Sequence, residues 1–343
     1  MLKKNGKCLV CSDHYKQRRS GEMSFRNTAF EACQSERKRR EGMRGRYATL
    51  MSGCLVAVSM MVASVAAKAA EKNYILVSPD GVEIAVQEFG NPSGPPIIFI
   101  HGLLGSHGNW ESQVKSPELS RFRLITFDLR GHGLSGKPDE GAAYGNARRW
   151  ADDLHTVVKA TQVKSPVLVG WSLGGAVMTN YVATYGDDHL GGLFYAAGVV
   201  ELSPQLMTAH PDVYGGLASD DAKVRFDATR KFLALCFARQ PDEVTFDRLL
   251  SNAAMSSLTM VQHTPSMPVL AADALPRVKV PVIMLYGEKD ALVMANASIE
   301  RATTLNPAID AMIYTDSGHA PFLEEAQRFN LDLVEFRDRI PMR

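Results

Sequence analysis

Short, continuous apolar runs recur along the chain from about residue 73 onward, separated by stretches with helical periodicity. An apolar run without polar alternation is typical of a strand buried on both faces, as in a parallel sheet covered by helices. The clearest runs are residues 97–100, 124–127, 167–169 and 282–286. The pattern predicts an α/β fold with a mostly parallel sheet flanked by helices, and ligands bind beyond the carboxyl ends of the strands in such sheets.

One segment interrupts this rhythm. Between residues 201 and 275, five prolines separate helix-like pieces such as 222–238 and 243–255. We interpret residues 201–275 as a helical cap that is inserted into a core formed by residues 73–200 and 276–340.

The charge is distributed unevenly along the chain. The formal net charge is only +1, yet residues 1–46 carry thirteen Lys or Arg against five Asp or Glu, so the remainder is mildly acidic. Because nucleic-acid binding needs a basic face, we expect no nucleic-acid partner for this remainder.

A second uneven feature is an uncharged stretch near the N-terminus, residues 47–67. Two arginines precede it, and the small-residue tripeptide Ala-Lys-Ala at 67–69 follows it. This order predicts a secretory signal peptide over residues 43–69 and an exported protein, periplasmic or secreted. The alternative is a retained N-terminal anchor, in which residues 47–67 tether the protein to a membrane.

The first 42 residues are basic and polar, and they stand in front of the predicted signal. We hypothesise that translation starts at Met43 and that residues 1–42 are either disordered or not translated. Cys8 and Cys11 form a Cys-x-x-Cys pair here, but no second pair stands at zinc-finger spacing. Cys236 is the only cysteine beyond residue 54, so the body of the chain cannot form an internal disulfide.

The sequence Gly170-Trp171-Ser172-Leu173-Gly174 places a G-x-S-x-G motif between an apolar run and a helical pattern over 176–185. A sharp turn from strand to helix forces an unusual backbone angle on the serine, and glycines are needed where a side chain would meet neighbouring backbone. The turn exposes the hydroxyl at the start of a helix, whose N–H groups favour negative charge. Ser172 is therefore the candidate nucleophile.

A serine hydroxyl needs a base, and the base needs an orienting carboxylate. Asp290 follows the predicted strand at 282–286, and His319 follows another apolar run, so the chain order is Ser, Asp, His. We predict His319 as general base and Asp290 as the acid. Glu201 and Asp316 are the competing acids, because Glu201 follows the preceding apolar run and Asp316 lies three residues before His319.

The loop after the run at 97–100 should supply an oxyanion donor. The backbone N–H groups of Leu103 and Leu173 are the candidate oxyanion hole. His101 lies in the same loop, and we interpret it as a structural residue whose ring forms hydrogen bonds within the loop. Asp128 and Arg130 likewise suit a tight turn rather than a second site.

Five segments together resemble the α/β-hydrolase superfamily over residues 73–340. They are HGLLGS at 101–106, DLRGHGLSGKP at 128–138, GWSLGG at 170–175, GEKDALV at 287–293 and SGHAPF at 317–322. The chain is similar to the serine esterase and lipase branch, including bacterial esterases and cofactor-free haloperoxidase-like hydrolases. No cofactor and no metal is implied. Haloperoxidase-like members commonly have Trp after the His-Gly of the oxyanion loop, whereas this chain has Leu103, which disfavours perhydrolysis.

The serine at the elbow also constrains the reaction. Dehalogenases and epoxide hydrolases of this fold use a carboxylate there, because a serine would form a stable ether. Ser172 therefore favours hydrolysis of a carboxylic ester through an acyl-enzyme. The alternatives with the same triad are carbon–carbon bond hydrolysis, acyl transfer and perhydrolysis, and a remote alternative is a non-catalytic binding module.

The expected partner is a small-molecule acyl substrate, whose identity and chain length the sequence does not specify. The cap offers candidate pocket walls, although aromatic and Met side chains at helical spacing are more often core. These residues are Phe226, Phe232, Phe237 and Met255.

Overall fold

The computed structural model describes residues 71–341. The predictions about residues 1–42, the signal peptide or anchor at 43–69 and the tether at 47–67 lie outside this part of the chain. Within residues 71–341, no helix is both long and apolar enough to cross a bilayer.

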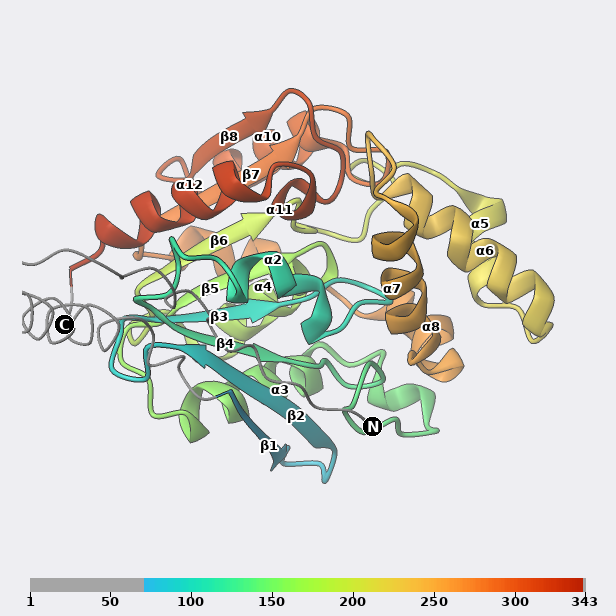
Figure 1. Ribbon diagram of the computed structural model, residues 1–343, viewed down its shortest axis with the longest axis horizontal. Helices are drawn as coiled ribbons and strands as arrows, with labels where there is room; N and C mark the ends of the chain where they lie inside the picture. Colours follow the sequence, from blue (N-terminus) through green and yellow to red (C-terminus); the bar gives the residue numbers. More distant parts are fainter. Residues whose placement is uncertain (1–70, 342–343) are drawn as a thin grey trace, which may run out of the picture. The chain divides into compact units, whose positions relative to one another are not determined.

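An eight-stranded sheet forms the centre of the described part, with strand order β1-β2-β4-β3-β5-β6-β7-β8 (Figure 1). The strands are β1 (Lys72–Val77), β2 (Glu83–Gly90), β3 (Pro96–Ile100), β4 (Arg123–Phe127), β5 (Val167–Trp171), β6 (Gly192–Ala196), β7 (Val282–Gly287) and β8 (Asp310–Tyr314). Strand β2 is antiparallel to β1 and β4, and all other neighbours are parallel. The predicted fold class is confirmed.

The continuous apolar runs form the buried middle of this sheet. All residues of β3, β5, β6 and β7 are buried, as expected for strands covered on both faces. Figure 1 shows the covering helices on both sides of the sheet. The helices are α2 (Glu111–Val114), α3 (Ala147–Ala160), α4 (Leu173–Tyr185), α10 (Ala295–Leu305), α11 (Pro321–Glu324) and α12 (Ala326–Asp338), with short 3₁₀ turns η1 (His107–Trp110) and η2 (Gly141–Ala143).

The segment between β6 and β7 is helical, and most of it lies beyond the carboxyl ends of the strands (Figure 1). Its elements are α5 (Pro211–Leu217), α6 (Ala222–Leu235), α7 (Glu243–Ala254), α8 (Leu258–His263), η3 (Thr264–Ser266), α9 (Ala271–Ala274) and η4 (Leu275–Arg277). Asp221 and Asp242 cap α6 and α7 by accepting hydrogen bonds from backbone N–H groups of the first turn. The last short helix, α9, packs against α4 of the core instead.

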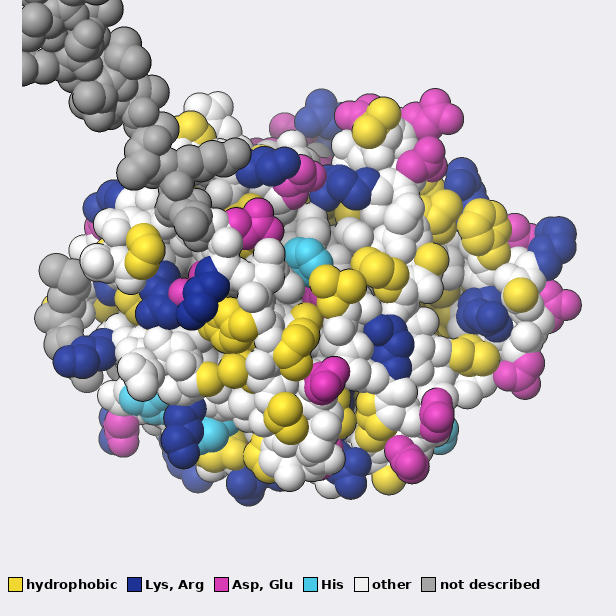
Figure 2. Space-filling view, turned by 60° about the horizontal axis from the view of Figure 1, so that its bottom comes forward, with side chains coloured by type: hydrophobic (Ala, Val, Ile, Leu, Met, Phe, Trp, Pro, Cys, Tyr) yellow, Lys and Arg dark blue, Asp and Glu magenta, His cyan; other side chains and the backbone are white. Residues whose placement is uncertain are grey.

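Charged side chains of both signs are interspersed on the face that Figure 2 shows, with apolar side chains between them. Elsewhere on the described chain, some charges pair one helical turn apart at or near the surface, such as Lys223 with Asp227 and Arg148 with Asp152. Such pairs contribute little to stability individually.

The turn after β4 is fixed by a buried ion pair. The guanidinium of Arg130 is fully buried and makes two bonds to Asp153, with Nε–Oδ2 at 2.6 Å and Nη2–Oδ1 at 2.7 Å. Its Nη1 also donates to Asp80 in the β1–β2 turn, at 2.9 Å. Arg130 therefore joins that hairpin, the turn and α3, which agrees with its interpretation as a structural residue.

Replacing Asp153 by Asn should reduce the free energy of unfolding by about 3 kcal/mol, because the fully buried Arg130 would lose one of its two carboxylate partners. Urea unfolding measures this change. Asp188→Asn is the matched control, since the Asp188 side chain is 91% exposed. A loss below about 1 kcal/mol for Asp153→Asn, as for an exposed pair, would contradict the structural role of the pair.

Candidate active site

Ser172 lies at a sharp turn between β5, which ends at Trp171, and α4, which begins at Leu173. Its backbone φ is +51°, a value that non-glycine residues rarely adopt outside strained functional turns. The turn also requires glycine close by, because a Cβ on Gly174 would lie 2.3 Å from the carbonyl oxygen of Ile100. The G-x-S-x-G motif thus forms the strand-turn-helix geometry that the sequence predicts.

A cavity of about 460 Å³ lies between this turn and the cap. Ser172, His319, Leu103 and Leu173 all line it. The cap side is mainly apolar and includes Leu202, Pro204, Met207, Tyr214, Leu217, Phe232 and Val261. No Lys, Arg, Asp or Glu of the described chain lines this cavity.

Only one of the four cap residues proposed as pocket walls has that position. Phe232 lines the cavity, whereas Phe226 is half exposed and lines a separate, smaller cavity. Phe237 packs into the hydrophobic core, and Met255 does not line the cavity. That three of the four candidates do not line the cavity agrees with the expectation that such residues are seldom ligand contacts, since helical periodicity does not tell which apolar face meets a cavity and which meets other helices.

The structure brings Asp290 and His319 together. Nδ1 of His319 lies 2.8 Å from Oδ2 of Asp290, and each side chain is only 1% exposed. The other carboxylate oxygen, Oδ1, accepts hydrogen bonds from the N–H groups of Leu292 and Val293 at 2.8 and 2.9 Å. A carboxylate on Nδ1 favours the tautomer whose proton lies on that nitrogen. Nε2 is then the proton acceptor, and it makes no hydrogen bond to a described residue.

The two competing acids lie elsewhere. The carboxylate of Glu201 binds Arg301, with Oε1 at 2.7 Å from Nη2. Asp316 binds the Lys289 ammonium at 3.0 Å, and its side chain is 74% exposed. Neither carboxylate makes a hydrogen bond to His319 among the described contacts.

The two predicted oxyanion donors flank Ser172. The loop after β3 approaches the serine so closely that a Cβ on Gly102 would lie 2.9 Å from the Cβ of Ser172. Leu173 is the first residue of α4, where backbone N–H groups have no partner within the helix. Within residues 71–341, the N–H of Leu103 donates to no backbone carbonyl.

His101 has the structural position that we expected. One ring nitrogen, Nδ1, lies 2.8 Å from the carbonyl oxygen of Gly102, and Nε2 accepts a hydrogen bond from the N–H of Leu129 at 3.0 Å. Complete burial lowers the pKa of His101 to about 4, so its ring is neutral near pH 7. His101 therefore joins two loops and does not line the cavity.

Two residues that bear on the site were not predicted from the sequence. The indole Nε1 of Trp171 donates to the carbonyl oxygen of His319 at 2.8 Å, which links the serine turn to the histidine loop. The carboxylate of Glu324 accepts a hydrogen bond from the N–H of Gly318 at 2.7 Å, next to His319 in the chain. A buried indole N–H usually has a hydrogen-bond acceptor. The sequence could therefore have indicated that Trp171 donates a hydrogen bond, but not to which carbonyl.

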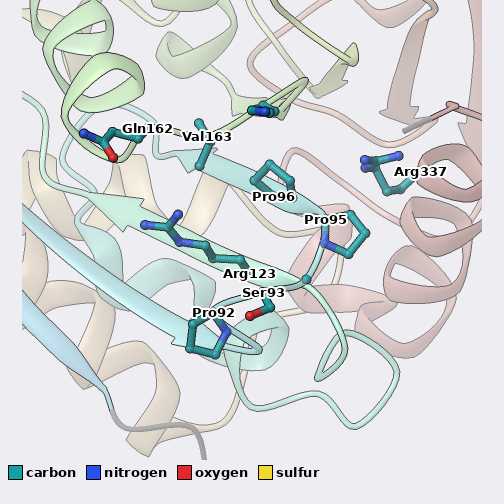
Figure 3. Close-up of a pocket in the computed structure, with 10 residues that line it drawn as sticks. Pro92, Ser93, Pro95, Pro96, Arg123, Gln162, Val163 and Arg337 are labelled. Carbon is teal, nitrogen blue, oxygen red and sulfur yellow. The ribbon is translucent and has the colours of Figure 1, made fainter. Parts of the chain in front are cut away.

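A smaller cavity of about 200 Å³ lies at the opposite ends of the strands, where β3 and β4 begin. Figure 3 shows Arg123 and Arg337 on different sides of Pro96 at its wall. Arg123 is already paired with Glu88 at 2.7 Å. No His, Cys, Asp or Glu of the described chain lines this cavity, so it lacks the imidazole or carboxylate that most often serves as a general base.

Among residues 71–341, no group of three or more His, Cys, Asp or Glu side chains is arranged to hold a metal ion. The candidate site instead contains a hydroxyl and an imidazole that line one cavity, and a carboxylate bound to the imidazole.

Comparison with known proteins identifies the family. The profile of the alpha/beta hydrolase fold family matches residues 95–326, and the chain belongs to this family. A crystal structure from Burkholderia cenocepacia, provisionally assigned as an aryl esterase, is 55% identical with a TM-score of 0.77, covering 77% of this chain and 97% of that one. The esterase RhEst1 from Rhodococcus sp. ECU1013 is 26% identical with a TM-score of 0.73, covering 78% and 99%.

A curated relative has a more specific name. The pimeloyl-[acyl-carrier protein] methyl ester esterase of Vibrio cholerae is 29% identical over 72% of this chain and 95% of its own length. Fold and relatives together define an esterase-like α/β hydrolase, which confirms the resemblance drawn from the five sequence segments.

Proposed function

We propose that this protein is a serine hydrolase that cleaves carboxylic esters through an acyl-enzyme intermediate. The observation that carries the proposal is that Ser172 and His319 line the same cavity, while Asp290, outside the cavity wall, binds the other nitrogen of the histidine ring. This arrangement leaves one imidazole nitrogen to serve the serine.

In the first half of the reaction, Nε2 of His319 takes the hydroxyl proton of Ser172 as Oγ attacks the ester carbonyl carbon. The carbonyl oxygen becomes negatively charged, and the N–H groups of Leu103 and Leu173 stabilise it. Asp290 stabilises the imidazolium. The tetrahedral intermediate then breaks its bond to the alcohol oxygen, and His319 returns its proton to the departing alcohol.

In the second half, water replaces the alcohol. His319 takes a proton from the water as the water oxygen attacks the acyl carbon. Collapse of the second intermediate releases the carboxylic acid and returns the proton to Ser172. No other group is needed for the atoms and charges to balance.

We further propose that the substrate is an uncharged, mainly apolar ester. The cavity has many apolar walls and no Lys, Arg, Asp or Glu from the described chain, so a substrate carboxylate would lose its hydration there without gaining a cation. The 55% identity to a provisional aryl esterase supports phenyl-type esters as the first probes. Carbon–carbon bond hydrolysis, acyl transfer and perhydrolysis would use the same triad, and no observed contact favours them.

Turnover of p-nitrophenyl esters tests this proposal. We expect rapid hydrolysis of neutral p-nitrophenyl acyl esters and a kcat/KM at least about tenfold lower for an ester of equal length that ends in a carboxylate, because burying an unpaired charge costs several kcal/mol. A fluorophosphonate probe should label Ser172 in the folded protein. Absence of both turnover and labelling would favour a non-catalytic binding module, and equal rates for the two esters would refute the neutral substrate.

A further inference from the structure

The carboxylate of Glu324 binds two segments that are far apart in the sequence. Its Oε2 accepts the N–H of Gly318 at 2.7 Å, in the loop that carries His319. Its Oε1 accepts the N–H groups of Ala238 and Arg239 at 2.9 and 3.1 Å. These two residues lie between the cap helices α6 and α7. One side chain therefore joins the histidine loop to the cap.

The two segments are in direct backbone contact at this point. A Cβ on Gly318 would lie 2.7 Å from the backbone nitrogen of Ala238 and 3.1 Å from the carbonyl carbon of Phe237. Because no side chain separates them, a small shift of the cap would be transmitted to the loop. Glu324 lies at the end of α11, only five residues after His319, so it is itself anchored to the loop it binds.

The same cap segment leads to the wall of the substrate cavity. Helix α6 ends at Leu235, shortly before Ala238, and Phe232 on that helix lines the cavity together with Ser172 and His319. The hydrogen bonds of one carboxylate thus help to fix both the cap segment next to the cavity wall and the loop that carries the imidazole of His319.

The hydrogen-bond geometry suits a side chain that accepts on both oxygens at this place. Burial raises the pKa of Glu324 above its ordinary value, and the backbone N–H groups of Arg239, Gly318 and Ala238 together with the charge of Arg239 offset this rise only in part. A carboxylate can accept hydrogen bonds on both oxygens at once. An amide can accept on only one, because its nitrogen is a donor.

We infer that Glu324 is a positioning residue that couples the cap to His319, so that the substrate wall and the general base are set relative to each other. The inference rests on the proposed role of His319 as base. Glu324 does not line the cavity and does not contact the reacting atoms. It acts through the backbone of Gly318 and of the cap.

Replacement of Glu324 by Gln tests the inference. Its amide nitrogen must face either the N–H of Gly318 or the two cap N–H groups, so one side of the junction is lost. We expect kcat per active site to fall at least about tenfold, because displacement of a catalytic group by about 1 Å can cost a hundredfold in rate. We also expect KM to rise more for p-nitrophenyl decanoate than for p-nitrophenyl acetate, since the longer ester uses more of the cap wall.

The concentration of active sites is measured by complete fluorophosphonate labelling, so that kcat is calculated for folded protein only. Glu335→Gln is the control, because its side chain is 63% exposed and pairs only with Arg339. If Glu324→Gln does not fold, Glu324→Asp keeps the charge but shortens the reach, and the same two effects are expected at smaller size.

An unchanged kcat per labelled site, even with a lower Tm, would overturn the inference and leave Glu324 a purely structural residue. A uniform rise in KM for both esters with unchanged kcat would overturn it as well. Failure of the proposed function is distinguishable, because wild-type protein would then show neither turnover nor labelling.

Discussion

Ser172→Ala is expected to abolish almost all ester hydrolysis, with kcat lowered by about 10⁶-fold. The hydroxyl oxygen would form the covalent bond to the acyl group, and no other hydroxyl is placed at the start of α4 against the cavity and His319. The residual rate would come from the oxyanion donors and from binding alone. Initial rates with p-nitrophenyl acetate, together with loss of fluorophosphonate labelling, measure the effect.

The same variant should remain folded. The hydroxyl of Ser172 makes no capping hydrogen bond at the start of α4, so its removal leaves no N–H group of that turn without its partner. Ser251→Ala is the control, because Ser251 is exposed on α7 and donates only to the carbonyl of Asp247 within that helix. Retention of a tenth of the wild-type rate by Ser172→Ala would mean that another residue is the nucleophile.

The parts of the fold that the sequence predicted well are those fixed by local pattern. Strands β3, β5 and β7 begin and end within about two residues of their apolar runs, because a strand buried on both faces must be apolar throughout. The turn at Ser172 was also predictable from a short segment. Glycine is needed at position 174 because the backbone there lies against the carbonyl oxygen of Ile100. In both cases the residues of one short segment are sufficient to determine its local structure.

The parts that the sequence did not predict depend on contacts between distant segments. Glu324 resembles any glutamate near a helix end, and its role becomes visible only when Ala238 and Arg239 are seen 85 to 86 positions away on the same carboxylate. Phe226 and Phe232 are six residues apart on one helix, yet one is exposed and the other lines the cavity. Helical spacing alone does not choose between these environments.

Choosing the acid required the same kind of information. Asp290, Glu201 and Asp316 all follow apolar runs, and the sequence could rank them only by resemblance and reach. In the structure, Glu201 is held by Arg301 and Asp316 by Lys289, whereas Asp290 meets the imidazole. Glu201 and Asp316 are thus directed at a cation and not at the imidazole.

Asp290→Asn is accordingly expected to lower kcat by about 10⁴-fold while the protein stays folded. The oxygen of the Asn side chain can still accept from Leu292 and Val293, as Oδ1 does now. Its amide nitrogen would then face Nδ1 of His319 and donate to it, which places the ring proton on Nε2. An imidazole with its proton on Nε2 cannot take the proton of Ser172, and the buried imidazolium would also lose its counter-charge.

Glu201→Gln and Asp316→Asn serve as matched controls, because each also exchanges a carboxylate for an amide in a loop after a strand. Each should cost less than about tenfold, since neither carboxylate contacts His319. Dividing each rate by the number of fluorophosphonate-labelled sites distinguishes a loss of catalysis from a loss of folded protein. Labelling must be run to completion, because a slow variant also reacts slowly with the probe. A severe loss in Glu201→Gln with a mild loss in Asp290→Asn would assign the acid to Glu201, and it would require a rearrangement that moves Glu201 away from Arg301 and toward the histidine.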